Sequence, residues 1–126
     1  MSDIVIGVIG FGTVGTGVAK ILLNDRAMLE ERAGCKIVLK RIADLDVSSD
    51  RGLALPEGML IADADAVIGD AEINTVIEVI GGEGAAKKFI EAALKAGKNV
   101  ITSNKEVIAK HGRAFSADDF DYRVYF

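Results

Sequence analysis

The sequence lacks the features that a disulfide framework, a membrane span or a metal site requires. Its single cysteine, Cys35, excludes a disulfide within the chain and is typical of the reducing cytoplasm, where we expect this protein to act. No stretch approaches the roughly eighteen consecutive apolar residues of a transmembrane helix. The histidine, cysteine and acidic residues do not cluster at the spacing of metal ligands, so we predict no metal site.

An excess of positive charge is also missing. The chain carries 15 Lys and Arg against 19 Asp and Glu, and its net charge of -4 argues against nucleic acid or an anionic membrane as a partner. No basic residue precedes the apolar run Ile4–Ile9, which excludes a signal peptide there. Half of the 126 residues are apolar and 27% are charged, so we expect one ordered domain over residues 1–126.

Strand and helix patterns alternate along the whole chain. The β-branched run Ile4–Ile9 is typical of a strand covered on both faces, and apolar residues recur at helical spacing from Val14 to Leu22. Later strands are predicted over Lys36–Ala43, Thr75–Ile80, Asn99–Thr102 and Tyr122–Phe126. Later helices are predicted from a cap at Asn24 or Asp25 to Gly34, near Ala64–Ile68, over Ala85–Leu94 before Gly97, and over Lys105–His111.

This alternation predicts a doubly wound α/β fold of the Rossmann type, with a mainly parallel sheet and helices on both faces. Residues 45–62 have no clear period and predict a loop. In such a sheet the ligand lies beyond the carboxyl ends of the strands. Four segments should therefore meet there: Gly10–Gly15, Asp44–Asp46, Ile80–Gly82 and Thr102–Lys105.

The first of these segments, Gly10-Phe11-Gly12-Thr13-Val14-Gly15, has the pattern G-x-G-x-x-G between a strand and a helix. In a dinucleotide-binding fold the first glycine allows a tight turn, the second lets the pyrophosphate approach the backbone, and the third lets the helix pack closely on the sheet. The N-terminus of that helix attracts phosphate. A plain glycine-rich turn is the alternative, because the pattern also arises by chance.

Asp44 supplies the candidate contact to the adenosine ribose. An acidic residue at the end of the second strand accepts hydrogen bonds from both ribose hydroxyls, and the neighbouring Ala43 offers no cation for a 2′-phosphate. Lys40 and Arg41 lie inside the strand, and Arg51 follows in the loop. We therefore expect NAD or NADP as the cofactor, with NAD preferred. A solvated turn aspartate is the alternative for Asp44.

The segment Ser103-Asn104-Lys105-Glu106 reads as a capping box, which places Lys105 in the first turn of a helix. The helix dipole there lowers the pKa of a lysine, and this suits proton chemistry at the ligand edge of the sheet. An ordinary surface lysine is the alternative.

Three blocks together resemble the nucleotide-binding domain of homoserine dehydrogenase: residues 10–18 (GFGTVGTGV), residues 79–82 (VIGG) and residues 96–105 (AGKNVITSNK). The resemblance implies an enzyme of threonine and methionine biosynthesis that interconverts homoserine and aspartate 4-semialdehyde with a nicotinamide cofactor. It implies that Phe11, Thr13 and Val14 line the cofactor and that Lys105 lies beside the nicotinamide and takes part in catalysis. Ile80, Gly81, Gly82, Thr102 and Ser103 belong to the same cofactor edge.

The substrate and dimerisation domain of that family is absent from these 126 residues. We expect the parent enzyme to form a homo-oligomer through that domain, and the domain described by this sequence to be inactive alone. Two other functions remain open: a stand-alone dinucleotide-binding or sensing module without catalysis, and the cofactor domain of a related enzyme such as an aspartate dehydrogenase. A reading frame that continues past Phe126 would favour the enzyme over the stand-alone module. Substrate turnover by the full-length protein would separate homoserine dehydrogenase from the related enzyme.

Replacement of Lys105 tests its proposed part in catalysis. In the full-length enzyme we expect Lys105→Ala to lower kcat by about 10²–10⁴-fold, the usual contribution of a positioned proton-transfer group, while the fold survives. Steady-state turnover together with circular dichroism measures this. A decrease in kcat of less than about threefold would indicate that Lys105 is an ordinary surface lysine.

Overall fold

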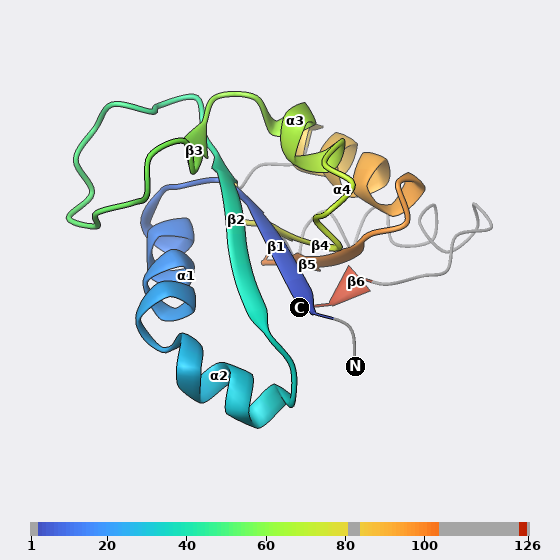
Figure 1. Cartoon of the computed structure of the whole chain (residues 1–126). Helices are drawn as coiled ribbons and strands as arrows, with labels where there is room; N and C mark the ends of the chain where they lie inside the picture. The colour runs from blue at the N-terminus through green and yellow to red at the C-terminus, as the bar shows by residue number, and fades with distance from the viewer. Residues whose placement is uncertain (1–2, 81–83, 104–123, 126) are drawn as a thin grey trace.

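The described part of the chain folds around one sheet of six parallel strands with helices on both faces (Figure 1). The structure is a computed structural model that describes residues 3–80, 84–103 and 124–125. The strands are β1 (Ile4–Ile9), β2 (Ile37–Ala43), β3 (Leu60–Ile61), β4 (Thr75–Glu78), β5 (Asn99–Thr102) and β6 (Val124–Tyr125). The helices are α1 (Thr13–Asn24), α2 (Arg26–Ala33), α3 (Ala64–Ile68) and α4 (Gly84–Lys95).

The strand order is β3-β2-β1-β4-β5-β6, so the chain leaves β1 toward one edge and later returns to build the other. This reversal between β1 and β4 is the switch point of a doubly wound sheet, where ligands bind outside the carboxyl ends of the strands. The order confirms the fold class predicted from the alternation of patterns.

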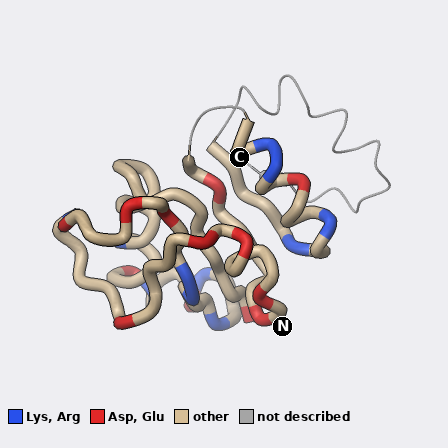
Figure 2. The backbone as a smooth tube through the Cα atoms, turned by 90° about the horizontal axis from the view of Figure 1, so that it is seen from above, with Lys and Arg blue, Asp and Glu red and all other residues tan. Residues whose placement is uncertain are grey.

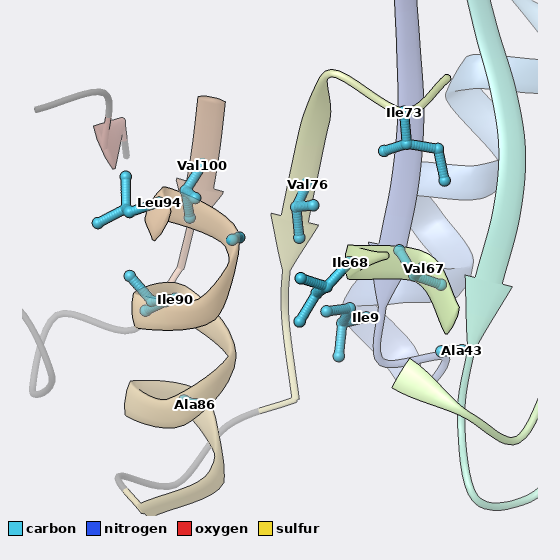
Figure 3. Close-up of a cluster of buried hydrophobic side chains, with 11 residues drawn as sticks. Ile9, Ala43, Val67, Ile68, Ile73, Val76, Ala86, Ile90, Leu94 and Val100 are labelled. Atoms are coloured by element: carbon cyan, nitrogen blue, oxygen red, sulfur yellow. The ribbon is translucent and has the colours of Figure 1, made fainter. Parts of the chain in front are cut away.

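Two hydrophobic cores lie on opposite faces of the sheet, because successive side chains of a strand point to opposite sides. Ile6 and Val8 of β1 pack with Ala19 of α1 in one core. Ile9 of the same strand joins the other core, which α3 and α4 cover (Figure 3). In that view Leu94 of α4 lies next to Val100 of β5, and Ile68 of α3 lies between Val76 of β4 and Ile9. A fully buried aliphatic side chain contributes about 1.5–3 kcal/mol.

Most elements follow the sequence prediction, but the boundaries of several elements differ from it. The strands Ile4–Ile9 and Asn99–Thr102 and the helix Ala64–Ile68 are confirmed. The strand predicted to begin at Lys36 begins at Ile37, whose N–H donates to Glu30 Oε2 at 2.8 Å. The strand predicted to reach Ile80 ends at Glu78, because the Ile80 N–H donates to the Glu78 side chain instead of the ladder.

The prediction of an unbroken loop over residues 45–62 was wrong. Leu60–Ile61 form β3, which pairs with Ile42 and Ala43 at the end of β2. A strand of two residues has no measurable period, so only the distant pairing reveals it.

The ends of the helices follow the predicted signals in part. Asp25 occupies the cap position of α2 but makes no side-chain capping bond, whereas Gly34 ends that helix in the left-handed conformation with φ 74°. The predicted strand Tyr122–Phe126 contains β6, and the predicted helix Lys105–His111 lies outside the described residues.

Acidic and basic positions are both spread along the backbone, as Figure 2 shows from above. Among the described residues, no helix combines the length and the apolar character needed to cross a membrane.

A close approach between β1 and α1 sets the start of the first helix. A Cβ atom added to Gly15 would lie 2.0 Å from the carbonyl oxygen of Gly10, so no side chain fits at that position. A Cβ added to Gly17, two residues later in the same helix, meets no atom within 4 Å.

Paired alanine substitutions test this packing constraint. Gly15→Ala must push α1 away from backbone atoms, and we expect it to lower the free energy of unfolding by at least the ~1–3 kcal/mol of a typical overpacked site. Gly17→Ala, the matched control, should raise that free energy by about 0.5–1 kcal/mol, because alanine is the better helix former. Urea unfolding measures both. Equal stability of the two variants would refute the constraint.

Candidate functional site

A cavity of about 570 Å³ opens at the carboxyl ends of the strands, beside the switch point between β1 and β4. It is lined by Ile9, Gly10, Gly12, Ala43, Asp44, Leu45, Ala62, Asp63, Ala64, Asp65, Val79, Ile80, Ala85 and Phe89. These residues end or follow β1 and β2, follow β3 and β4, or belong to α3 and α4. The volume and the largely apolar lining are those of a small-molecule or cofactor site.

The glycine loop after β1 forms one wall of the cavity. Gly10 has φ 111°, a conformation that favours glycine, and its added Cβ would lie 2.9 Å from the Val79 carbonyl carbon. Gly12 differs, because a Cβ there would meet no protein atom within 4 Å. Gly12 lines the cavity, so its missing side chain leaves room for a ligand to reach the backbone. The loop therefore fits a dinucleotide pyrophosphate.

The N-terminus of α1 adds a favourable charge to this wall. The helix begins at Thr13, its cap residue Gly12 makes no side-chain capping bond, and its first turn contains no acidic residue. The N–H groups of a first helical turn have no partner within the helix and carry a partial positive charge. An anion next to Gly12 would satisfy both.

Asp44 joins the end of β2 to the glycine loop. Its Oδ2 accepts the Phe11 N–H at 2.7 Å and its Oδ1 accepts the Asp46 N–H at 2.8 Å. The side chain keeps 23% of its surface exposed, and the residue lines the cavity. Each carboxylate oxygen can accept a second hydrogen bond, so Asp44 remains able to bind a ligand hydroxyl.

Arg51 reaches the same place although it lies in the long loop before β3. Its Nη2 donates to the Asp46 carbonyl oxygen at 2.6 Å and lies 3.6 Å from Asp44 Oδ1. Its guanidinium carbon is 4.7 Å from the centre of the Phe11 ring, a cation–π distance. The Asp46 carboxylate is another 3.6 Å partner. The sequence shows that Arg51 follows in a loop, but only the structure brings it to Asp44.

Asp46 is a second negative charge beside Asp44. Hydrogen bonds from Ser49, and a further one from the Ser48 N–H, lower the pKa of the Asp46 carboxyl to about 2. Lys40 does not reach this group, because it pairs with Asp70 at 2.7 Å and Glu72 at 3.2 Å.

Glu78 is the last residue of β4 and directly precedes Val79 and Ile80, which line the cavity. Its side chain is fully buried, with Oε1 accepting from Thr102 Oγ1 at 2.6 Å and Oε2 accepting from the Ile80 N–H at 2.9 Å. Sequence reasoning did not single out Glu78 as a site residue. A charged residue inside an apolar strand was the available signal.

The predicted site residues fall into three groups. Gly10, Gly12, Asp44 and Ile80 line the cavity. A second group does not line the cavity: its exposed members are Thr13, Val14 and Ser103, and its buried members are Gly15, Phe11 and Thr102. Phe11 is 2% exposed and Thr102 is 1% exposed. Gly81, Gly82 and Lys105 lie outside the described residues.

The placement of Phe11 limits what its side chain can do. It packs in the core beside α1 and beneath Arg51, so it supports the glycine loop from below and does not face the cavity.

Sequence reasoning missed the segment after β3 and the start of α4. Ala62–Asp65 and the pair Ala85 and Phe89 line the cavity, and Leu45 beside them is 93% exposed. An apolar side chain so exposed at a cavity rim is available to a flat apolar ligand. The available signal for this segment was Asp63, a residue type that favours the N-cap of a helix. Its Oδ1 accepts the Asp65 N–H at 2.9 Å and so caps α3.

Comparison with protein-family models matches residues 10–118 to the model described as "Homoserine dehydrogenase, NAD binding domain". The chain is 36% identical to the homoserine dehydrogenase of Bacillus subtilis over 94% of its own length, and 38% identical to that of Corynebacterium glutamicum over 99%. It spans 27% and 28% of those two proteins.

Solved structures of homoserine dehydrogenases share the fold. One from Staphylococcus aureus superposes with a TM-score of 0.86 at 31% identity, covering 98% of this chain and 32% of that one. The enzyme from Thiobacillus denitrificans superposes with a TM-score of 0.82 at 34% identity, covering 92% of this chain and 27% of that one.

Proposed function

The chain belongs to the family of homoserine dehydrogenase NAD-binding domains, and from that premise we propose that its cavity binds the nicotinamide cofactor with which the complete protein interconverts homoserine and aspartate 4-semialdehyde. The observation that carries this proposal is the open space at Gly12. No protein atom there prevents a side chain, yet the residue that faces the cavity at the start of α1 is a glycine. When bound, the nicotinamide supplies the hydride acceptor and donor.

Each wall of the cavity has a part in the proposed complex. The N–H groups at the start of α1 and the backbone at Gly12 would hold the pyrophosphate. Asp44 would accept hydrogen bonds from the adenosine ribose, and the exposed Leu45 would cover one face of the adenine. The nicotinamide half would then lie at the β4 and β5 side, near Ile80, with Lys105 as the proposed catalytic residue.

We propose that NAD is preferred over NADP, because of the charges around the ribose site. Asp44 and Asp46 carry two negative charges and Arg51 one positive charge, so the group repels a 2′-phosphate. Arg51 reduces this repulsion. We therefore propose that Arg51 determines how strongly the site discriminates against NADP.

Calorimetric titration with both cofactors tests the ribose site. We expect NAD to bind at least tenfold more tightly than NADP, a difference of about 1.4 kcal/mol. Asp44→Asn should narrow this ratio, because it removes one charge and can still accept a backbone hydrogen bond; Arg51→Gln should widen it.

Asp50→Asn is the matched control for the same titration. It removes an equal charge from the same loop, where Asp50 Oδ1 accepts the Gly52 N–H, and should leave the ratio unchanged. Two results would contradict the proposed contact between Asp44 and the ribose: tighter binding of NADP than of NAD by the wild type, or an unchanged ratio of NAD to NADP affinity in Asp44→Asn.

We further propose that substrate binding and oligomer contacts come from the remainder of the complete protein. The 126-residue chain should then bind the dinucleotide without oxidising homoserine, because it cannot orient the substrate against the cofactor, an effect that contributes about 7–11 kcal/mol. Absorbance at the wavelength of reduced nicotinamide, with homoserine and NAD present, measures this. Robust turnover by the chain alone would contradict the proposal.

A further inference from the structure

Glu78 is the one carboxylate with no exposed surface among the residues that the structure describes. Burial of a carboxylate costs several kcal/mol unless donors replace its water. Both of its oxygens have such donors, the Thr102 hydroxyl at 2.6 Å and the Ile80 N–H at 2.9 Å. Hydrogen bonds to a charged acceptor are shorter and stronger than neutral ones, so these two partners are held firmly.

The two partners of Glu78 lie at the carboxyl ends of two different strands, β4 and β5. Ile80 is the second residue after β4 and lines the cavity. Thr102 is the last residue of β5, in register with Glu78 and directly before Ser103. The Ser103 N–H also donates to the Glu78 carbonyl oxygen at 3.4 Å. A single residue therefore fixes the direction in which the chain leaves both β4 and β5.

This junction lies on the far side of the switch point from the ribose site. Asp44 and Arg51 belong to the β2 side of β1, whereas Glu78 and Thr102 belong to the β4 and β5 side. A dinucleotide bound across a switch point places one mononucleotide half on each side. With the adenosine half at Asp44, the nicotinamide half meets the segments that Glu78 holds.

We propose that Glu78 is a positioning residue for the nicotinamide half of the cofactor and that it acts through Ile80 and Thr102. The inference rests on the proposed function, since it requires a dinucleotide in the cavity. A carboxylate that served only the stability of the sheet would affect both halves of the ligand alike. A positioning residue affects the nicotinamide half and leaves the adenosine half unchanged.

The test compares two ligands on the purified 126-residue chain by calorimetry: NADH, and ADP-ribose, which lacks the nicotinamide. Thr102→Val keeps the shape of the side chain but removes the hydroxyl donor from Glu78 Oε1. We expect it to weaken NADH binding about tenfold and to leave ADP-ribose within twofold of the wild type. Thr75→Val is the matched control, because Thr75 is a buried threonine at the other end of β4 and donates to Asn74. It should change neither affinity.

Glu78→Asp provides a second, independent variant. It keeps the charge but is one methylene shorter, so it cannot hold both partners, and it should show the same selective loss of NADH affinity. Equal losses of NADH and ADP-ribose in these variants, or no loss of NADH affinity in either, would overturn the positioning role while leaving the proposed function intact. A wild-type chain that binds neither ligand would overturn the proposed function, and this inference with it.

Discussion

The contact between Gly15 and the carbonyl oxygen of Gly10 is the constraint on which the rest of the site depends. Because no side chain fits between them, α1 starts directly against the end of β1. The first turn of the helix consequently opens at the edge of the cavity, with Gly12 exposed to it. If a side chain displaced the helix, its free N–H groups would move away from the proposed pyrophosphate position.

Two carboxylates extend this geometry to the neighbouring strands. Asp44 binds the Phe11 N–H and so ties the end of β2 to the glycine loop. Glu78 binds the Ile80 N–H and the Thr102 hydroxyl and so ties β4 to β5. In both cases a carboxylate accepts short hydrogen bonds between strand ends, beyond the point where the regular backbone hydrogen bonds of the sheet stop. The two differ in exposure, since Asp44 still faces the cavity and Glu78 is closed off.

The electrostatic character of the proposed ribose site depends on a residue from a distant part of the loop. Arg51 pairs with Asp44 and Asp46 and stacks on Phe11, which is buried beneath the glycine loop. The same guanidinium therefore supports the loop and moderates the negative charge that a 2′-phosphate would meet. In the proposed complex, selectivity between NAD and NADP depends on the balance of charges within this cluster and not on a single aspartate.

The sequence by itself determined the elements with strong local signals. The continuous β-branched run of β1, the apolar stripe of α4 and the glycine pattern each follow from neighbouring residues, and from them the parallel fold and its ligand edge could be predicted. Tertiary structure alone decided what depends on contacts between distant residues. β3 exists because Leu60–Ile61 pair with β2, and Arg51 acts at Asp44 because that loop folds back over Phe11. The hydrogen bond between Glu78 and Thr102 joins two neighbouring strands, β4 and β5. No local pattern records such pairings, since they form only when the sheet brings separate segments together.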